Sequence, residues 1–238
     1  MLLNALAGIW RPWRAALAAV PSQCAVCHAW PARRVCGACE ARFAAPRHRC
    51  STCAMPMPHG VDVCGECLRH PPGFDACLAA VDYDYPWAQA MAAFKFHADA
   101  GWAGTLAGLL RDAPGVQQAL DAADLVLAMP LSRERLRERG FNQALLLARQ
   151  LAPHKAPPQL LLRTKAAEAQ SSLARAQRLR NLRGSFAVEP ALAHRVAGQR
   201  VVLLDDVMTT GATLQSAARV LRQAGAAHIT AVVVARTP

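Results

Sequence analysis

The sequence has few aromatic residues, few lysines and no long apolar run. Aromatic residues make up 5% of the 238 residues, and lysine supplies only 3 of the 27 basic residues. No stretch of eighteen or more apolar residues occurs, so we propose no transmembrane helix. The apolar pattern in residues 1–22 is interrupted by Arg11 and Arg14, and no basic residue precedes it, which is the wrong order for a secretory signal. We therefore expect a cytoplasmic protein whose N-terminal amphipathic helix covers its body, with membrane-surface contact as the alternative.

Acidic residues are also scarce, because 16 Asp and Glu stand against 27 Lys and Arg and leave a formal net charge of +11. The excess is concentrated in residues 131–183, where twelve basic residues and three glutamates give a net charge of +9. A coding bias explains arginine in place of lysine but does not explain this clustering. The segment indicates an anionic partner, such as pyrophosphate or a nucleic-acid backbone. Its few aromatic residues predict little base stacking.

Eight of the nine cysteines form four CxxC pairs, and only Cys77 stands apart. Two thiolates separated by two residues can bind one metal ion, and two such pairs complete a tetrahedral zinc site. Sequential pairing predicts two structural zincs, on a first and a second cysteine set. The first set is Cys24, Cys27, Cys36 and Cys39, and the second set is Cys50, Cys53, Cys64 and Cys67. Cross-braced pairing and disulfides are the alternatives, and we expect Cys77 to be a buried, inert thiol.

An apolar run near the end of the sequence finishes in two adjacent carboxylates. Residues 201–204 are apolar and rich in β-branched side chains, which predicts a buried parallel strand. Asp205 and Asp206 follow at its carboxyl end, where open α/β sheets bind their ligands. Because neighbouring carboxylates repel each other, we expect hydroxyl donors or a cation beside them.

A turn rich in threonine follows the acids and precedes a helical pattern over residues 214–224. The turn consists of Thr209, Thr210, Gly211, Ala212 and Thr213. Thr213 is the expected N-cap of the helix, and Gly211 lets the backbone approach a ligand closely. Free amides at a helix start favour a phosphate, although the spacing and lysine of a Walker loop are absent. The alternative is an ordinary strand, turn and helix with solvated aspartates.

The stretch VVLLDDVMTTGATL, residues 201–214, resembles the phosphoribosyl-pyrophosphate (PRPP) loop of type I phosphoribosyltransferases. Further matches extend the resemblance over nearly the whole chain and narrow it to the ComF family of competence-associated, phosphoribosyltransferase-like proteins. The matching residues are Lys95 in FKFH, Arg139, Asn142 and Gln143 in RGFNQ, and the spaced set Arg163, Gln170, Arg175, Arg178, Asn181 and Phe186.

The resemblance implies a site for PRPP with Mg²⁺. In that site Asp205 and Asp206 orient the ribose and help to hold the magnesium, while residues 209–213 anchor the 5′-phosphate. Arg163, Arg175 and Arg178 close on the pyrophosphate, the last two from a helix predicted over residues 171–182. No role follows from the sequence for the other matches, which are Lys95, Arg139, Asn142, Gln143, Gln170 and Asn181.

Three hypotheses of function follow from the resemblance. The first is a competence protein that binds PRPP and assists DNA uptake or single-stranded DNA handling, together with proteins of the competence machinery. The second is an active phosphoribosyltransferase that transfers ribose 5-phosphate from PRPP to an acceptor that the sequence does not identify. The third is a nucleic-acid-binding protein with a vestigial site, which the intact acids and threonines disfavour. We favour the first hypothesis, and whether the protein is an enzyme stays open.

Strand and helix patterns alternate from Pro71 onward, which predicts an α/β fold with a type I phosphoribosyltransferase-like parallel sheet flanked by helices. The expected strands are residues 78–85, 125–129, 160–163, 201–204 and 229–235. The expected helices are residues 87–97, 101–111, 142–151, 171–182 and 214–224. The predicted domains are an N-terminal amphipathic helix (1–22), a double zinc ribbon (23–70) and a phosphoribosyltransferase-like domain (71–238).

Overall fold

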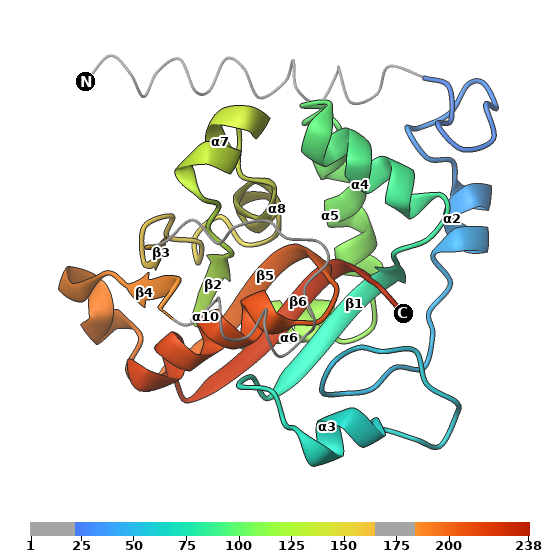
Figure 1. The fold of residues 1–238 in the computed structure, drawn as a ribbon. Helices are drawn as coiled ribbons and strands as arrows, with labels where there is room; N and C mark the ends of the chain where they lie inside the picture. Colours follow the sequence, from blue (N-terminus) through green and yellow to red (C-terminus); the bar gives the residue numbers. More distant parts are fainter. Residues whose placement is uncertain (1–21, 165–183) are drawn as a thin grey trace, which may run out of the picture. The chain divides into compact units, whose positions relative to one another are not determined.

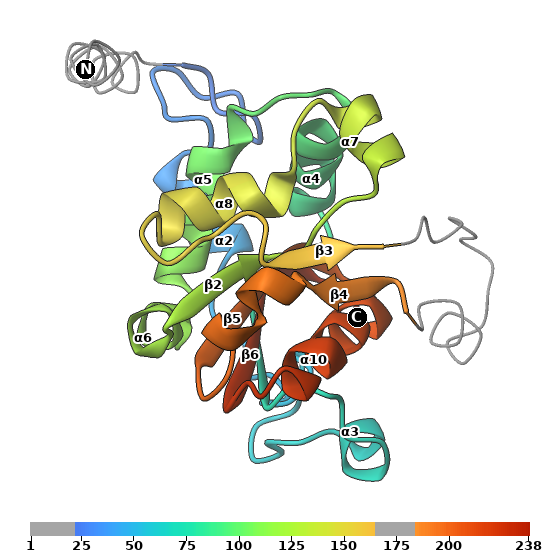
Figure 2. The same ribbon diagram turned by 90° about the vertical axis from the view of Figure 1, so that its left-hand side faces the viewer.

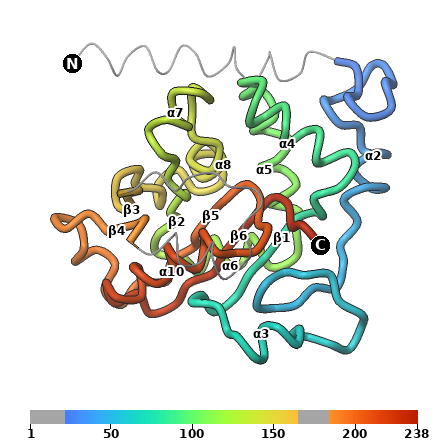
Figure 3. Tube along the Cα trace, in the orientation of Figure 1, coloured from blue at the N-terminus to red at the C-terminus, as the bar shows by residue number. Residues whose placement is uncertain are grey.

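The computed structural model describes residues 22–164 and 184–238 (Figure 3). The helix predicted over residues 171–182 lies outside this part, as does all but the last residue of the helix predicted over residues 1–22. The chain divides into two compact units, residues 1–42 and 43–238. This division falls between the two cysteine sets. The domain boundaries predicted after residues 22 and 70 stay a prediction. Within the described residues, no helix is long and apolar enough to cross a membrane.

The first unit consists, as far as it is described, of a short hairpin and most of helix α2 (Gly37–Phe43). The hairpin is closed by an antiparallel bridge between Ser22 and Ala32, whose backbone amides each donate to the other residue's carbonyl at 2.7 Å. The hairpin and the start of α2 carry the first cysteine set.

A four-stranded parallel sheet forms the centre of the second unit (Figure 1). Its order is β1 (Ala76–Asp82), β6 (His228–Arg236), β5 (Arg200–Met208) and β2 (Leu125–Ala128). Residues 201–204 and 229–235 are buried in β5 and β6, as expected for central strands that are covered on both faces. The sheet therefore confirms the predicted strands at 125–129, 201–204 and 229–235 and pairs them in parallel.

Helices cover both faces of the sheet. The described helices of the second unit are α3 (Gly65–Arg69), α4 (Trp87–Phe96), α5 (Trp102–Asp112), α6 (Val116–Ala122), α7 (Arg133–Arg139), α8 (Gln143–Leu151), the 3₁₀ helix η1 (Pro190–Arg195) and α10 (Ala212–Gln223). Figures 1 and 2 show α5 and α8 on one face and α10 on the other. The covering helices bury leucines against the strands, including Leu106, Leu147 and Leu221, which are fully buried. This packing is the source of most of the stability of such a layered fold.

One predicted strand has a different partner from the expected one. The sequence predicts residues 160–163 as part of the alternating strand and helix pattern of the main sheet. The structure instead pairs β3 (Leu161–Arg163) antiparallel with β4 (Phe186–Val188) in a separate two-stranded sheet. Segments of three residues are too short to carry a periodicity that would distinguish these arrangements.

Candidate functional site

Asp205 and Asp206 lie inside strand β5 and not in a loop after it. The sequence predicts that the strand ends at Leu204, but β5 continues to Met208 because β6 pairs with it along this whole length. On the opposite side β2 ends at Ala128, which pairs with Leu204. The two acids therefore lie where β5 extends beyond the end of β2, at the carboxyl edge of the sheet.

A lysine balances the acid pair. The Nζ of Lys95, from the last turn of α4, lies 2.8 Å from Oδ1 of Asp206, and the two side chains are only 14% and 10% exposed. Burial and the neighbouring Asp206 carboxylate raise the pKa of Asp205 to about 7, although Lys95 and Arg163 act in the opposite direction. A ligand that donates hydroxyl groups, or a cation, would relieve this repulsion.

The threonine-rich turn leads directly from β5 into α10. Gly211 has a φ of +74° and is the N-cap residue, so the helix begins at Ala212 and the prediction of Thr213 as N-cap is wrong. The left-handed backbone at the glycine turns the chain into the helix two residues earlier than the side-chain pattern indicates. The hydroxyl of Thr210 accepts a hydrogen bond from the Ala212 amide at 3.4 Å. The first amides of α10 have no intrahelical acceptors and form the positive end of a twelve-residue helix.

Arg163, the last residue of β3, is a further charged residue near the acid pair. Its Cζ lies 5.4 Å from the ring centre of Phe186 on the paired strand. Burial and the charge of Arg135 lower the pKa of Arg163, and the charge of Asp205 raises it. The guanidinium is thus within electrostatic range of both α7 and the acid pair. Arg175 and Arg178, which the resemblance also places in this site, lie outside the described residues, as do the family matches Gln170 and Asn181.

The two family-matching motifs, FKFH and RGFNQ, contact each other. The rings of Phe94 and Phe141 have centroids 5.5 Å apart, and the buried Gln143 donates from Nε2 to the Phe94 carbonyl at 3.3 Å. Arg139 lies with its Cζ 5.4 Å from the ring centre of the exposed Phe96. These contacts fix the last turn of α4, which carries the lysine that pairs with the acids.

Asn142 has a structural role that the sequence analysis missed. Its Oδ1 accepts from the Leu145 amide at 3.1 Å and so caps α8, while its Nδ2 donates to the Met129 carbonyl at 3.0 Å. The residue therefore ties the start of α8 to the end of β2. The sequence predicts a helix that begins at Asn142, and the available signal was that asparagine is a preferred N-cap residue.

Helix α7 was also not predicted, because none of its seven residues is buried and no apolar stripe marks it. Ser132 caps it by accepting from the Arg135 amide at 3.2 Å, and Gly140 ends it with a φ of +75°. A serine before the segment and a glycine after it were the available signals.

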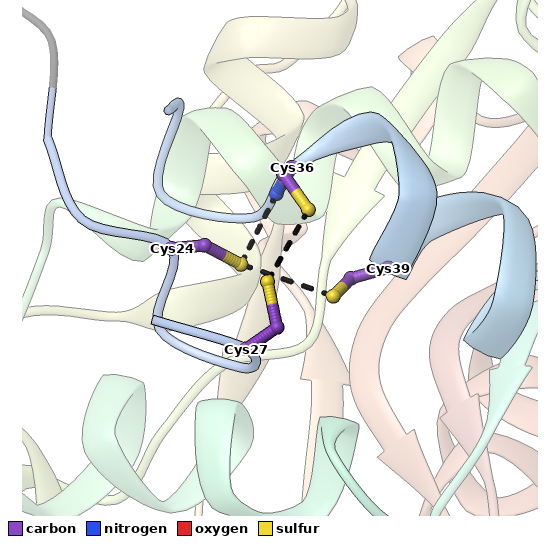
Figure 4. A group of neighbouring side chains, drawn as sticks. All are labelled: Cys24, Cys27, Cys36 and Cys39. Atoms are coloured by element: carbon purple, nitrogen blue, oxygen red, sulfur yellow. Dashed lines mark hydrogen bonds between the residues drawn. The ribbon is translucent and has the colours of Figure 1, made fainter. Parts of the chain in front are cut away.

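The first cysteine set brings four sulfur atoms to one point, as Figure 4 shows. All four lie within 4.8 Å of one another, with 3.9 Å between Cys24 and Cys39 and 3.7 Å between Cys27 and Cys36. Sulfurs about 2.3 Å from a tetrahedral zinc are separated by about 3.8 Å, so the set fits zinc. Amides of Val26 and Cys36 donate to the sulfur of Cys24 at 3.5 and 3.3 Å, which stabilises thiolate charge.

The second cysteine set has the same geometry within the second unit. Its four sulfurs also lie within 4.8 Å of one another, with 3.7 Å between Cys53 and Cys64. The amide of Cys64 donates to the sulfur of Cys50 at 3.3 Å. The CxxC pairs, called knuckles below, are therefore grouped sequentially, the first with the second and the third with the fourth. All nine cysteines are free of disulfides. Both sets can hold zinc in a closed site of four sulfurs, which leaves no coordination position for a substrate.

Cys77 is buried in β1, as predicted. Its sulfur lies 3.6 Å from the sulfur of Met208, and burial raises the pKa of the thiol to about 12. Because the thiolate is the reactive form, this cysteine is inert at neutral pH.

Comparison with known proteins relates this geometry to a family. Residues 137–238 match the phosphoribosyl transferase domain, a segment that includes β5, the threonine-rich turn and α10. The chain is 32% identical over 223 residues to the DNA utilization protein YhgH of Salmonella typhimurium, which covers 88% of this chain and 95% of that protein. It is 31% identical over 202 residues to competence protein F of Haemophilus influenzae, with 82% and 87% covered. Competence protein ComFC of Bacillus subtilis is 39% identical over 103 residues, with 43% and 40% covered.

These similarities agree with the fold. The domain match and the parallel sheet confirm the predicted phosphoribosyltransferase-type α/β fold, preceded by cysteine groups that could form a zinc ribbon. Relatives at this level of identity extend over more than four fifths of the chain. The protein therefore belongs to the ComF family of phosphoribosyltransferase-like proteins.

Proposed function

We propose that the protein binds PRPP together with Mg²⁺ at the acid pair and the threonine-rich turn, and that it handles single-stranded DNA during DNA uptake. One observation carries the ligand assignment. Two carboxylates at the open carboxyl edge of β5 lie a few residues before the amides that begin α10. This order suits a sugar that is esterified to phosphate, because hydroxyl groups donate to the acids and phosphate oxygens accept from the amides.

Different residues of the site bind different parts of the ligand. Asp205 and Asp206 accept hydrogen bonds from the ribose 2′ and 3′ hydroxyls, which offsets the repulsion between the carboxylates. Amides and hydroxyls of residues 210–213 bind the 5′-phosphate, and Arg163 interacts with the pyrophosphate. Asp205 and Asp206 would also help to hold Mg²⁺, which would supply positive charge to offset that of the pyrophosphate. Lys95 keeps the acid pair from accumulating two uncompensated charges before the ligand arrives.

Titration calorimetry with PRPP, ribose 5-phosphate and pyrophosphate tests the ligand assignment. With Mg²⁺ present, PRPP should bind more tightly than either of its halves, because it fills both parts of the site. The absence of PRPP binding in the presence of Mg²⁺ would remove the assignment.

Transfer of the phosphoribosyl group is the alternative function, and the intact acid pair and turn favour it. Displacement of pyrophosphate from ribose C1 passes through a cationic sugar-like transition state and needs no protein nucleophile. Residues of this site would act by positioning the sugar and by neutralising the leaving group. A screen for pyrophosphate release separates the two functions: release that depends on an added acceptor supports transfer, and binding without release supports the role of PRPP as a ligand.

Helix α7 and its surroundings support the DNA part of the proposal. The helix carries Arg133, Arg135, Arg137 and Arg139, and none of its residues is buried. Phe96, which is 69% exposed, lies beside Arg139 and adds an aromatic ring where the sequence predicts little base stacking. The names of the relatives, DNA utilization protein and competence protein, agree with this partner.

Fluorescence anisotropy of a labelled single-stranded oligonucleotide tests DNA binding. With roughly four to six phosphate contacts, the slope of log affinity against log salt should lie near −3 to −4. Replacing Arg135 and Arg137 with Gln should make the slope shallower, while Arg195→Gln, on exposed η1 outside the basic segment, should leave it unchanged. Arg180 and Arg183, which lie outside the described residues, form a second pair to test. A slope near zero, or no binding at about 50 mM salt, would reject the DNA role.

A further inference from the structure

The last residue of β6 is a buried arginine beside the end of β5. Arg236 is 5% exposed and pairs in register with Met208, the residue that directly precedes the threonine-rich turn. The second cysteine set belongs to the same compact unit. A guanidinium this deep in a protein needs most of its donors occupied, because an unpaired buried charge is strongly destabilising.

The donors of Arg236 connect the second cysteine set to the turn. Its Nε donates to the carbonyl of Cys53 at 3.0 Å, and its Nη1 donates to the carbonyl of Met208 at 3.3 Å and to that of Thr237. The amide of Thr237 also donates to the Met208 carbonyl, at 3.0 Å. One side chain thus holds the backbone of a metal knuckle and the backbone that enters the turn.

The side chain of Met208 continues this connection beneath the turn. Met208 is 3% exposed. A Cβ added at Gly211 would lie only 2.6 Å from the Cε of Met208. A displacement of Met208 therefore changes the space under the glycine that starts α10. A cavity of about 310 Å³ is lined both by Cys53, Cys64 and Cys67 of the second cysteine set and by Met208, Thr209 and Thr210. This cavity gives the turn room to move when its support is lost.

Further bonds attach the same knuckle to the sheet. The carbonyl of Ser51 accepts from the Cys77 amide at 3.0 Å. The guanidinium of Arg49 donates to the Ala54 carbonyl at 3.2 Å and lies 2.7 Å from Oδ1 of Asp82 on β1. The position of the Cys53 carbonyl thus depends on the fold of the knuckle, which a metal bound to its thiolates would stabilise.

We propose that Arg236 is a positioning residue through which metal occupancy of the second cysteine set determines the affinity of the threonine-rich turn for phosphate ligands. Without metal, the knuckle loosens, Arg236 loses its bond to Cys53, and the turn exchanges its fixed shape for several. Because coupling between sites is reciprocal, a ligand on the turn also strengthens metal binding at the second set. The first cysteine set lies in the other unit and provides a matched control. The affinity part of this inference rests on the proposed function, whereas the connection to the turn does not.

Hydrogen exchange of the full chain measures the connection without any ligand. The peptide that contains residues 208–213 should exchange faster in Cys67→Ser than in wild type, and at the wild-type rate in Cys27→Ser. Because Cys67→Ser can unfold the knuckle region, Arg236→Gln serves as the second variant. It keeps all eight thiolates and should retain both metals, yet it should show the same faster exchange in the turn. Wild-type exchange of the turn in a folded Arg236→Gln protein would overturn the proposal.

The absorption spectrum of bound Co²⁺ provides a measurement that PRPP would not change if Arg236 had a purely structural role. In Cys27→Ser, only the second set keeps four thiolates, so one equivalent of Co²⁺ per chain should occupy mainly that set, and the absorption spectrum then reports on it. PRPP with Mg²⁺ should shift this spectrum and slow removal of Co²⁺ by a chelator at least about fivefold. The matched Cys67→Ser protein, which keeps only the first set complete, should show neither effect. An unchanged spectrum while PRPP is bound would overturn the proposal, whereas failure of the wild type to bind PRPP would refute the proposed function and leave the exchange experiment decisive.

Discussion

Lys95 and Asp206 form a nearly buried ion pair, with Nζ 2.8 Å from Oδ1, that joins the last turn of α4 to β5. The pair connects the FKFH motif, whose role the sequence does not reveal, to the acids of the candidate site. It also places a lysine side chain beside two neighbouring carboxylates, which repel each other. The protein itself therefore offsets one of the two negative charges in the ligand-free site.

Lys95→Met should lower the free energy of unfolding at pH 7 by about 3 kcal/mol, because removing one partner of a buried pair leaves an uncompensated charge. Urea unfolding measures this loss, which should shrink at pH 4, where Asp205 is protonated and the acid pair carries less negative charge. A double-mutant cycle with Asp206→Asn supplies the control. An equally large loss from Lys95→Met in the Asp206→Asn background would contradict the pairing.

Asp205→Asn should stabilise the ligand-free protein at high pH. Burial and Asp206 raise the pKa of Asp205 to about 7 in the folded state, above the ordinary value of about 3.9. The protonated carboxyl therefore favours the fold fully below about pH 4, and this contribution is lost as the pH rises through 7. The variant should exceed wild type by at least about 1 kcal/mol at pH 8 and by much less at pH 4.

Urea unfolding at the two pH values measures this difference, with Asp112→Asn as a control at an exposed carboxylate that ends α5. If Asp205→Asn and wild type are equally stable at pH 8, burial and repulsion from Asp206 do not destabilise the charged form of Asp205, and the prediction is wrong.

Gly211→Ala should destabilise the protein more than Gly198→Ala, although the two glycines have the same φ. Both Gly211 and Gly198 have a φ of +74°, but a Cβ at Gly198 meets nothing within 4 Å, whereas one at Gly211 lies 2.6 Å from Met208 Cε. Gly198→Ala should cost roughly 1–2 kcal/mol for the left-handed backbone alone. Gly211→Ala should cost more and should also weaken PRPP binding. Thermal unfolding and calorimetry of both variants check this, and equal effects would show that the methionine gives way freely.

The purified protein should contain two zincs per chain, since both cysteine sets fit a tetrahedral ion. Elemental analysis should give about one zinc for Cys27→Ser and about one for Cys67→Ser. Only the second of these variants should destabilise the unit that contains the sheet, because the first set lies in the other unit. A wild-type value near one would mean that a single set binds metal, and a value of zero under reducing conditions without chelator would reject both sites.

The sequence predicts those parts of the fold that repeat a local pattern. The apolar runs of β5 and β6 and the spacing of the CxxC pairs identify the central strands and the sequential metal sets. Contacts between distant segments leave no such signal, and for this reason the pairing of Lys95 with Asp206 and the bonds of Arg236 could not be foreseen. The end of β5 was misplaced for a related reason: two aspartates look like a loop in the sequence, but pairing with β6 keeps them in the strand.

The most direct test of the proposed site is titration of PRPP with Mg²⁺ into the folded protein that carries both Asp205→Asn and Asp206→Asn. Wild type and Asp112→Asn should bind PRPP with equal affinity. The double variant should keep its fold, because removal of two repelling charges does not disturb the sheet, and should show no measurable binding. Undiminished affinity of the folded double variant would contradict the assignment of the acid pair to the ribose.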